Sequence, residues 1–340
     1  MSFLATKYVL PHSIRKLQQN GYVSQDMYKK DKPEIATNVG MILVFTSFIS
    51  VSLVPLFVRI LSLLHPFDFE TSDLSETHLA FLLVVSIYAL YGLVDDLVDI
   101  GRILKLILPI TFSYPLISVV IPQMIWVPLF GEQNLDSFIF SDITKADIFR
   151  IIIIPVYVMV VANLVNMHSG YNGLQSGLSI ILMVTLCIKS YLDGILVNII
   201  PLASIMGAIM AFYAFNKYPA KALEGNIGSL FFGSAIGAAI VVQNYWWFGF
   251  YILIPHTINF FLWISWLFLM KKYPDDYLLD GNNHQKFGQI REDQTIEVPN
   301  PLTMKWLPNY YYKLTESQST YIMYIVTFFF CLSAILYNLQ

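Results

Sequence analysis

The sequence is poor in charge. Of its 340 residues, 13% are Asp, Glu, Lys or Arg, which is about half of the fraction that a soluble domain carries. Hydrophobic residues make up 56% of the chain, and the mean hydropathy is +0.60. This composition excludes an ordinary soluble protein and indicates an integral membrane protein.

Cysteine is also scarce. The two cysteines, Cys187 and Cys331, each lie inside an apolar run. Such residues are typical of small buried side chains and do not predict a disulfide framework. A signal peptide is not predicted either, because the N-terminal apolar segment is short and shows no clear cleavage site.

Long apolar runs are abundant. A helix needs about 20 mostly apolar residues to cross the bilayer core, and such stretches lie near 40–64, 78–94, 104–128, 148–166, 174–189, 194–215, 226–243, 246–270 and 318–338. They predict an all-α fold, a polytopic transmembrane bundle of about nine to ten spans that forms a single domain over residues 1–340.

Lysine and arginine are distributed unevenly over the intervening loops. Loops 1–39, 95–103, 167–173, 216–225 and 271–317 hold most of them, whereas the alternate loops clearly hold only Lys145. Because basic loops stay on the cytoplasmic side, the first set of loops is predicted to be cytoplasmic, with the N-terminus inside and the C-terminus outside. Nearly every polar motif lies in this set, so we expect chemistry that faces the cytoplasm.

An acidic string, Asp95, Asp96 and Asp99, closes the second apolar stretch. On a helix, Asp95 and Asp99 share a face, with Asp96 beside them. Oxygen-rich clusters of this kind suit Mg²⁺, and Lys105 two turns later suits phosphate. A solvated helix end, with its acids paired to Arg102 and Lys105, explains the string equally well.

Amides and glycines follow the fourth stretch. Asn163 and Asn166 are three residues apart and face the same way, and the sequence GYNGLQSG at 170–177 permits a tight turn. Neutral amides in apolar surroundings need partners, so we favour a functional interpretation here. Gly225 and Asn226 open the seventh stretch, where a helix N-terminus could hold a diphosphate or could simply be capped by Asn226.

Two polar segments complete the pattern. The loop 271–317 mixes charges and aromatics, and the alternation around Asp293 and Gln294 predicts a short β-hairpin. This loop could form a lid or a sugar-recognition surface, or merely a structural hairpin. The stretch 16–40, which precedes the first long apolar run, could line the same cavity.

In this order, four motifs resemble the polyprenyl-phosphate N-acetylhexosamine-1-phosphate transferase superfamily. The motifs are VSQDMYKKDKPEI at 23–35, VDDLVDIGRILKLILP at 94–109, NLVNMHSGYNGLQSG at 163–177 and FNKYPAKALEGNIGSLFFG at 215–233. The third and fourth look closer to the branch formed by the dolichyl-phosphate GlcNAc-1-phosphate transferases and their archaeal relatives than to the peptidoglycan branch. The resemblance implies transfer of a sugar-1-phosphate, expected to be GlcNAc-1-phosphate, from a UDP-sugar to a polyprenyl or dolichyl phosphate, with Mg²⁺ or Mn²⁺ and release of UMP.

The resemblance also implies roles for single residues. It implies a catalytic group formed by Asp95, Asp96 and Asn226, and metal ligands in Asn166 and Asn226. The substrate-binding residues that it implies are Lys105, Asn163, Asn172, Asp99, His284 and Arg291. The last two lie in the loop that selects the sugar in relatives.

The implied setting is a prokaryotic, archaeal-like cell membrane rather than the endoplasmic reticulum. Its partners would be the UDP-sugar, the lipid phosphate and membrane lipid, with no nucleic acid, and a homodimer stays open.

The chain departs from the superfamily pattern in three places. Gly225-Asn226 stands where relatives have Gly-Asp, Ala36-Thr37 stands where many have Pro-Glu, and one span of the usual ten is not visible at the start. The loss of one carboxylate at Asn226 leaves open a catalytically impaired homologue that binds UDP-sugar or lipid phosphate without turnover. A secondary transporter is a third interpretation, although the acids lie at one face and no inverted repeat is visible.

Overall fold

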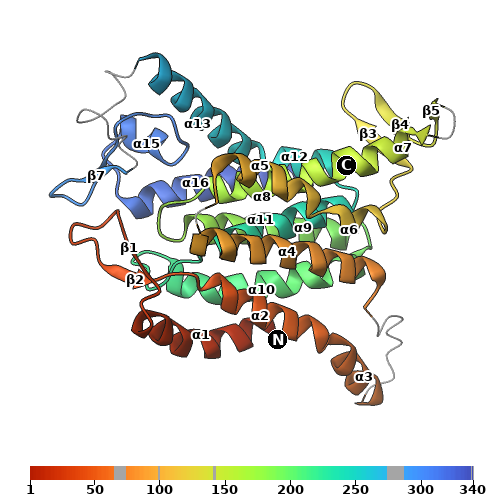
Figure 1. The fold of residues 1–340 in the computed structure, drawn as a ribbon, viewed down its shortest axis with the longest axis horizontal. Helices are drawn as coiled ribbons and strands as arrows, with labels where there is room; N and C mark the ends of the chain where they lie inside the picture. Colours follow the sequence, from red (N-terminus) through yellow and green to blue (C-terminus); the bar gives the residue numbers. More distant parts are fainter. Residues whose placement is uncertain (65–73, 99, 141–142, 274–286, 338, 340) are drawn as a thin grey trace.

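A computed structural model of the chain describes residues 1–64, 74–98, 100–140, 143–273, 287–337 and 339. Most of these residues are helical, and most of the long helices lie side by side along one axis (Figure 1). The ten longest are α1 (Ser2–Gln19), α2 (Gly40–Ser52), α3 (Val54–Leu64), α4 (Glu76–Val98), α8 (Ile154–Met167), α9 (Leu174–Leu192), α10 (Ile200–Asn216), α11 (Gly225–Val242), α13 (Ile254–Lys272) and α16 (Glu316–Leu336).

The predicted helical membrane bundle is confirmed. Within the described residues, six helical stretches are long and apolar enough to cross a membrane, or seven if the bent pair α12 (Trp246–Ile252) and α13 counts as one span. The two helices of this pair meet at 62°, directly before Pro255, whose missing N–H group cannot continue a helix. The apolar helix α10, with 17 residues, is slightly shorter than a full span.

The predicted span at 104–128 is wrong in its second half. The chain forms α5 (Arg102–Thr111) and the short α6 (Tyr114–Ile117), and then leaves the helix to enter strand β3 (Met124–Val127). Pro122 interrupts this stretch, and the β-branched and aromatic residues at 125–127 pair with β4 (Gly131–Asn134) instead. An apolar run of this composition reads equally well as helix or strand.

In the described part of the chain, four antiparallel hairpins extend from the ends of the bundle. Besides β3–β4, these are β1 (Val23–Gln25) with β2 (Glu34–Ala36), β5 (Phe138–Phe140) with β6 (Ile143–Thr144), and β7 (Gln289–Ile290) with β8 (Ile296–Glu297). The pair β7–β8 confirms the hairpin predicted around Asp293 and Gln294. The remaining short elements are α7 (Lys145–Ile148), a π-helical turn at Phe149–Ile153, a 3₁₀ turn at Leu196–Ile199 and α15 (Trp306–Tyr311).

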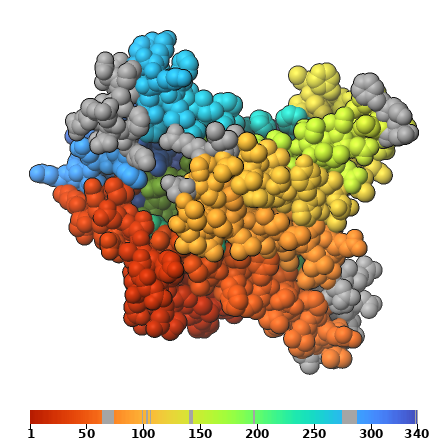
Figure 2. All heavy atoms as spheres, viewed as in Figure 1, coloured from red at the N-terminus to blue at the C-terminus, as the bar shows by residue number. Residues whose placement is uncertain are grey.

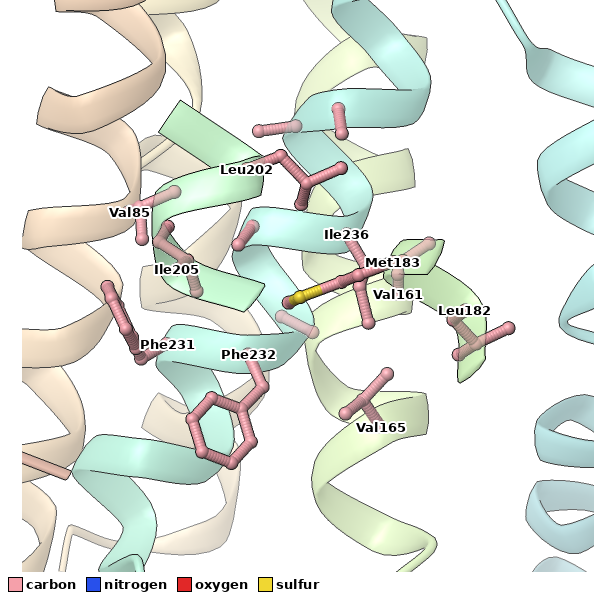
Figure 3. Packing of buried hydrophobic residues seen from close by; sticks show 14 of the residues in the cluster. Val85, Val161, Val165, Leu182, Met183, Leu202, Ile205, Phe231, Phe232 and Ile236 are labelled. Carbon is pink, nitrogen blue, oxygen red and sulfur yellow. The ribbon is translucent and has the colours of Figure 1, made fainter. Parts of the chain in front are cut away.

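The core of the bundle surrounds α11, which packs most extensively against α4 and α8. Figure 3 shows its Phe231, Phe232 and Ile236 among side chains of the neighbouring helices, including Val85 and Val161. Helix association in a membrane depends on close packing, which small residues permit. A Cβ on Gly92 of α4 would come within 2.5 Å of the Asn226 carbonyl oxygen, so this glycine lets the end of α4 touch the start of α11.

Apart from residues 2–19, which were predicted as part of a loop, the loops separate into the two sets expected from the basic residues, at opposite ends of the bundle. Hairpin β1–β2, strand β7 and α15 lie at one end, and β3, β4, β5, α7 and the C-terminus lie at the other (Figure 1). The N-terminal helix α1, which the sequence did not predict, packs along α2 and α10. Its Thr6 hydroxyl bonds the Thr46 hydroxyl of α2 at 2.6 Å.

Candidate active site

A polar cavity of about 360 Å³ lies at the end of the bundle that carries β1–β2 and α15. Figure 2 shows a hollow there, with the middle of the chain at its floor between N-terminal and C-terminal segments. All five loops of the predicted cytoplasmic set contribute to its lining, which consists of Ser24, Gln25, Asp26, Met27, Thr37, Asp96, Asn166, Ser169, Gly170, Tyr171, Asn172, Gln175, Asn216, Leu223, Glu224, Gly225, Asn226, Ser229 and Phe287.

Asp95 connects a lysine to the cavity. One carboxylate oxygen, Oδ1, lies 2.8 Å from the Lys105 Nζ and also accepts the backbone N–H of Ile100 at 3.0 Å. The other oxygen accepts a hydrogen bond of 3.0 Å from the side-chain amide of Asn226. Asp95 is buried, whereas the Lys105 side chain is partly exposed, so this ion pair lies at the edge of the protein.

Asp96 occupies the N-terminus of α11. Its two carboxylate oxygens accept the backbone N–H groups of Asn226 and Ile227 at 3.1 and 3.2 Å. The positive end of the helix dipole and two unpaired N–H donors stabilise a negative charge at this position. Asp96 therefore caps α11 and lines the cavity at the same time. The sequence had suggested either a metal site or a solvated helix end, and neither interpretation included a cap on another helix.

The loop after α8 forms a second wall. Asn166 lies in the lining, and the side-chain oxygen of Asn172 accepts the backbone N–H of Ala220 at 2.9 Å. The backbone N–H of Asn172 donates to the Glu316 carboxylate at 2.5 Å. Asn172 thus ties three segments of the chain together beside the cavity.

Two of the remaining predicted site residues, Asn163 and Arg291, do not join this group. The Asn163 amide donates to the Met159 carbonyl of its own helix at 2.9 Å, and Arg291 pairs with Glu297 at 3.3 Å in the β7–β8 hairpin. Neither belongs to the cavity lining. Asp99 and His284 lie outside the described residues, and the substrate roles of all four remain predictions.

Several charged residues at the cavity were missed from the sequence. Asp26 and Glu316 hold the Lys29 ammonium at 3.1 and 2.6 Å. Lys305 is half-buried against the loop after α8 and donates to the Ser169 carbonyl at 2.8 Å, and desolvation lowers the pKa of its ammonium group to about 8. Burial also raises the pKa of the Glu224 carboxyl to about 7. The only sequence signal for Glu224 was a charge directly before Gly225-Asn226.

The lining fits a hard divalent cation such as Mg²⁺ or Mn²⁺ better than a softer one such as Zn²⁺ or Cu²⁺. In the part of the chain that the structure describes, no group of three or more His, Cys, Asp or Glu side chains could hold a metal. Mg²⁺ asks for less, since it keeps several waters and takes one or two carboxylates together with substrate phosphates. Carboxylate and amide oxygens at Asp96, Glu224, Asn166 and Asn226 provide a donor set of this kind.

Comparisons with known proteins agree with this architecture. The family described as Glycosyl transferase family 4 matches residues 78–244. A protein of Saccharolobus solfataricus assigned as a UDP-N-acetylglucosamine–dolichyl-phosphate N-acetylglucosaminephosphotransferase is 31% identical over 273 residues, 77% of this chain and 74% of the relative. The protein of the same description from Sulfolobus acidocaldarius is 30% identical over 272 residues, 77% of this chain and 74% of the relative. A phospho-N-acetylmuramoyl-pentapeptide-transferase of Streptococcus mutans is 26% identical over 251 residues, 73% of this chain and 72% of the relative.

The helical bundle and these relatives define an integral membrane glycosyl transferase. The chain belongs to glycosyl transferase family 4, within the polyprenyl-phosphate N-acetylhexosamine-1-phosphate transferase superfamily. The resemblance found in its four motifs is thereby confirmed. Membership gives no support to a secondary transporter, and none of the relatives supports an impaired homologue.

Proposed function

We propose that the protein transfers GlcNAc-1-phosphate from UDP-GlcNAc to a polyprenyl phosphate of the dolichyl type, at the cytoplasmic face of a prokaryotic cell membrane. The observation that carries the proposal is the junction of α4 and α11, where Asp95, Asp96 and Asn226 lie together beside a polar cavity. The Sulfolobales relatives, whose assigned activity is this transfer, support the choice of sugar and lipid.

The reaction is a displacement at phosphorus. An oxygen of the lipid phosphate attacks the β-phosphorus of the UDP-sugar, the bond to the oxygen that bridges the α- and β-phosphates breaks, and UMP leaves. A bound Mg²⁺ or Mn²⁺ would offset the negative charge of the diphosphate. The Lys105 ammonium, held 2.8 Å from Asp95, is placed to attract the lipid phosphate at the rim. The amide-lined floor holds the nucleotide without adding charge.

The test is UMP release by the purified protein with a panel of UDP-sugars. We expect release with UDP-GlcNAc that requires both the polyprenyl phosphate and Mg²⁺, and that stops with EDTA. Release without the lipid would indicate hydrolysis instead of transfer. Binding of labelled UDP-GlcNAc without any release would favour the impaired homologue, and counter-flow of a solute in proteoliposomes would favour a transporter.

A further inference from the structure

Three acidic side chains line the cavity, and only one of them has a cationic partner among the side chains that the structure describes. Asp26, Asp96 and Glu224 all contribute to the lining. Asp26 pairs with Lys29 at 3.1 Å. Among the side chains that the structure describes, which do not include that of Arg102, no lysine, arginine or histidine forms an ion pair with Asp96 or Glu224. Two carboxyl groups that have no ion-pair partner among the described side chains therefore line the same cavity.

Glu224 is held rigidly in the cavity wall. Its side chain is 9% exposed, and its Oε2 accepts the Asn216 amide at 3.1 Å. The same amide group donates to the Ala222 carbonyl at 3.0 Å, and the Asn216 oxygen accepts the Ser176 hydroxyl at 2.6 Å. This network fixes Oε2 of Glu224, and the backbone N–H of the same residue also bonds its carboxyl group, so the side chain is held where it lines the cavity.

The fold also makes room for this side chain. A Cβ on Gly228 would lie 2.5 Å from the Glu224 Cβ. A larger residue at position 228 would therefore displace Glu224. On the other side of the same turn, a Cβ on Gly225 would lie 2.9 Å from the Asp96 Oδ2. The backbone at Gly225 therefore lies close against the Asp96 carboxylate.

Asn226 completes the arrangement with a neutral oxygen. Its amide nitrogen is committed to Asp95, which leaves the carbonyl oxygen Oδ1 as the atom available to a ligand. A cation in the cavity would thus find one amide oxygen at Asn226 and full charges only at Asp96 and Glu224. Asn166 and Ser229 add neutral oxygens to the same lining.

We propose that Glu224 is a ligand of the divalent cation used in the transfer, and that it supplies, with Asp96, the negative charge that the amide of Asn226 lacks. The inference rests on the proposed function for the cation's purpose, but its test does not depend on turnover. The competing interpretation is structural, in which Glu224 only anchors Asn216 at the end of α10.

Two matched variants separate these interpretations. Glu224→Gln keeps the shape of the side chain and an oxygen that accepts the Asn216 amide, but removes the charge. Ser176→Ala loosens Asn216 from its other side, and Ser176 is not part of the cavity lining. A structural role predicts similar effects from both variants, whereas a ligand role predicts an effect from the first alone.

The experiment is a titration of the purified full-length protein with Mn²⁺ and UDP, followed by electron paramagnetic resonance. We expect Glu224→Gln to raise the Mn²⁺ Kd on the order of tenfold or more, and Ser176→Ala to change it less than about twofold. Adding Asn226→Asp to Glu224→Gln returns one carboxylate and should recover most of the lost affinity. Thermal unfolding without metal should be similar for the Glu224→Gln and wild-type proteins.

Three results would overturn the inference: a wild-type Kd in Glu224→Gln, equal weakening in both single variants, or no Mn²⁺ binding by the wild-type protein. UMP release is measured in parallel on the same preparations. If the wild-type protein binds Mn²⁺ through Glu224 but releases no UMP with any UDP-sugar, the proposed function fails and the ligand assignment stands. If it releases UMP and Glu224→Gln binds Mn²⁺ normally, only the ligand assignment fails.

Discussion

The side-chain amide of Asn226 donates a hydrogen bond of 3.0 Å to the carboxylate of Asp95. An aspartate at position 226 would replace this donor by a second negative oxygen at contact distance, and like charges so close repel unless a cation lies between them. We therefore expect Asn226→Asp to lower the free energy of unfolding by about 1–3 kcal/mol in EDTA. Thermal unfolding with and without Mn²⁺ measures this, and Mn²⁺ should stabilise the variant more than the wild-type protein. Equal stability of the two proteins in EDTA would contradict the assigned hydrogen bond.

Asp96 is predicted to matter for transfer more than for folding. In Asp96→Asn, an amide takes the place of the carboxylate beside the N–H groups of Asn226 and Ile227, and the charge in the cavity is lost. We expect kcat for UMP release to fall on the order of 100-fold or more. The matched control is Asp136→Asn, which neutralises an exposed acid at the opposite end of the bundle. If both variants retain full activity, Asp96 serves only as a helix cap.

The sequence predicted the helices well because each span is a long apolar run, and length separates such runs from strands. It also brought Asp95, Asp96 and Asn226 into one site, since the motif order resembles a family. The stretch at 104–128 failed because Ile125 and Trp126 suit a strand as well as a helix.

The missed residues have a different physical reason. Lys29 and Glu316 are 287 positions apart, and no local pattern in the sequence pairs them. The sequence around Lys305 is that of an ordinary loop lysine, and only the tertiary fold packs its side chain against Ser169. Contacts of this kind arise from tertiary packing, whereas capping residues and apolar periods can be read within one segment.

Gly92 is predicted to set the distance between α4 and α11. A methyl group at this position would meet the Asn226 carbonyl oxygen at 2.5 Å, so Gly92→Ala should separate Asp95 and Asp96 from the start of α11. We expect a loss of about 1–3 kcal/mol in the free energy of unfolding, with a larger proportional loss of transfer. Gly101→Ala is the control, because nothing lies within 4 Å of its Cβ position, and it should change stability by less than about 0.5 kcal/mol. Similar unfolding curves for the two variants would contradict this prediction and would mean that α4 and α11 can move apart without loss of stability.

The buried ion pair between Lys29 and Glu316 is predicted to couple the N-terminal hairpin to α16. Glu316→Gln keeps an acceptor for the Asn172 N–H but deprives Lys29 of a partner at 2.6 Å. A double-mutant cycle with Lys29→Met should give a coupling free energy of about 1–3 kcal/mol in thermal unfolding. The same cycle on Arg291 and Glu297, a more exposed pair, should give less than about 1 kcal/mol. Equal coupling free energies in the two cycles would contradict the prediction that the Lys29–Glu316 pair stabilises the fold more than an exposed ion pair does.

Lys305 is predicted to make the protein more stable as the pH rises above 8. Burial lowers the pKa of its ammonium group from 10.5 to about 8, so between these values the folded protein has lost the proton that the unfolded chain keeps. The free energy of unfolding should therefore increase with pH over this window, by up to about 3 kcal/mol from this group.

The groups that face Lys305 are Glu316, His168, Tyr28 and Tyr171. Burial raises the pKa of Tyr28 to about 12 and that of Tyr171 further, so both phenols stay neutral over this window. The pKa of His168 is lowered well below its ordinary value by burial, which keeps this ring neutral as well. In the unfolded chain these phenols ionise near pH 10, which lowers stability at the upper end of the window, so the contribution of Lys305 is obtained by comparison with a variant that lacks it.

The measurement is thermal unfolding from pH 7.5 to 10 of the wild-type protein, Lys305→Met and Lys313→Met. The free energy of unfolding of the wild-type protein should rise with pH relative to that of Lys305→Met, because the methionine side chain has no proton to release. Lys313 is exposed in the same segment, and its variant should follow the wild-type curve. Parallel curves for the wild-type protein and Lys305→Met would mean that Lys305 keeps its proton, and that the carboxylate of Glu316 compensates for its burial.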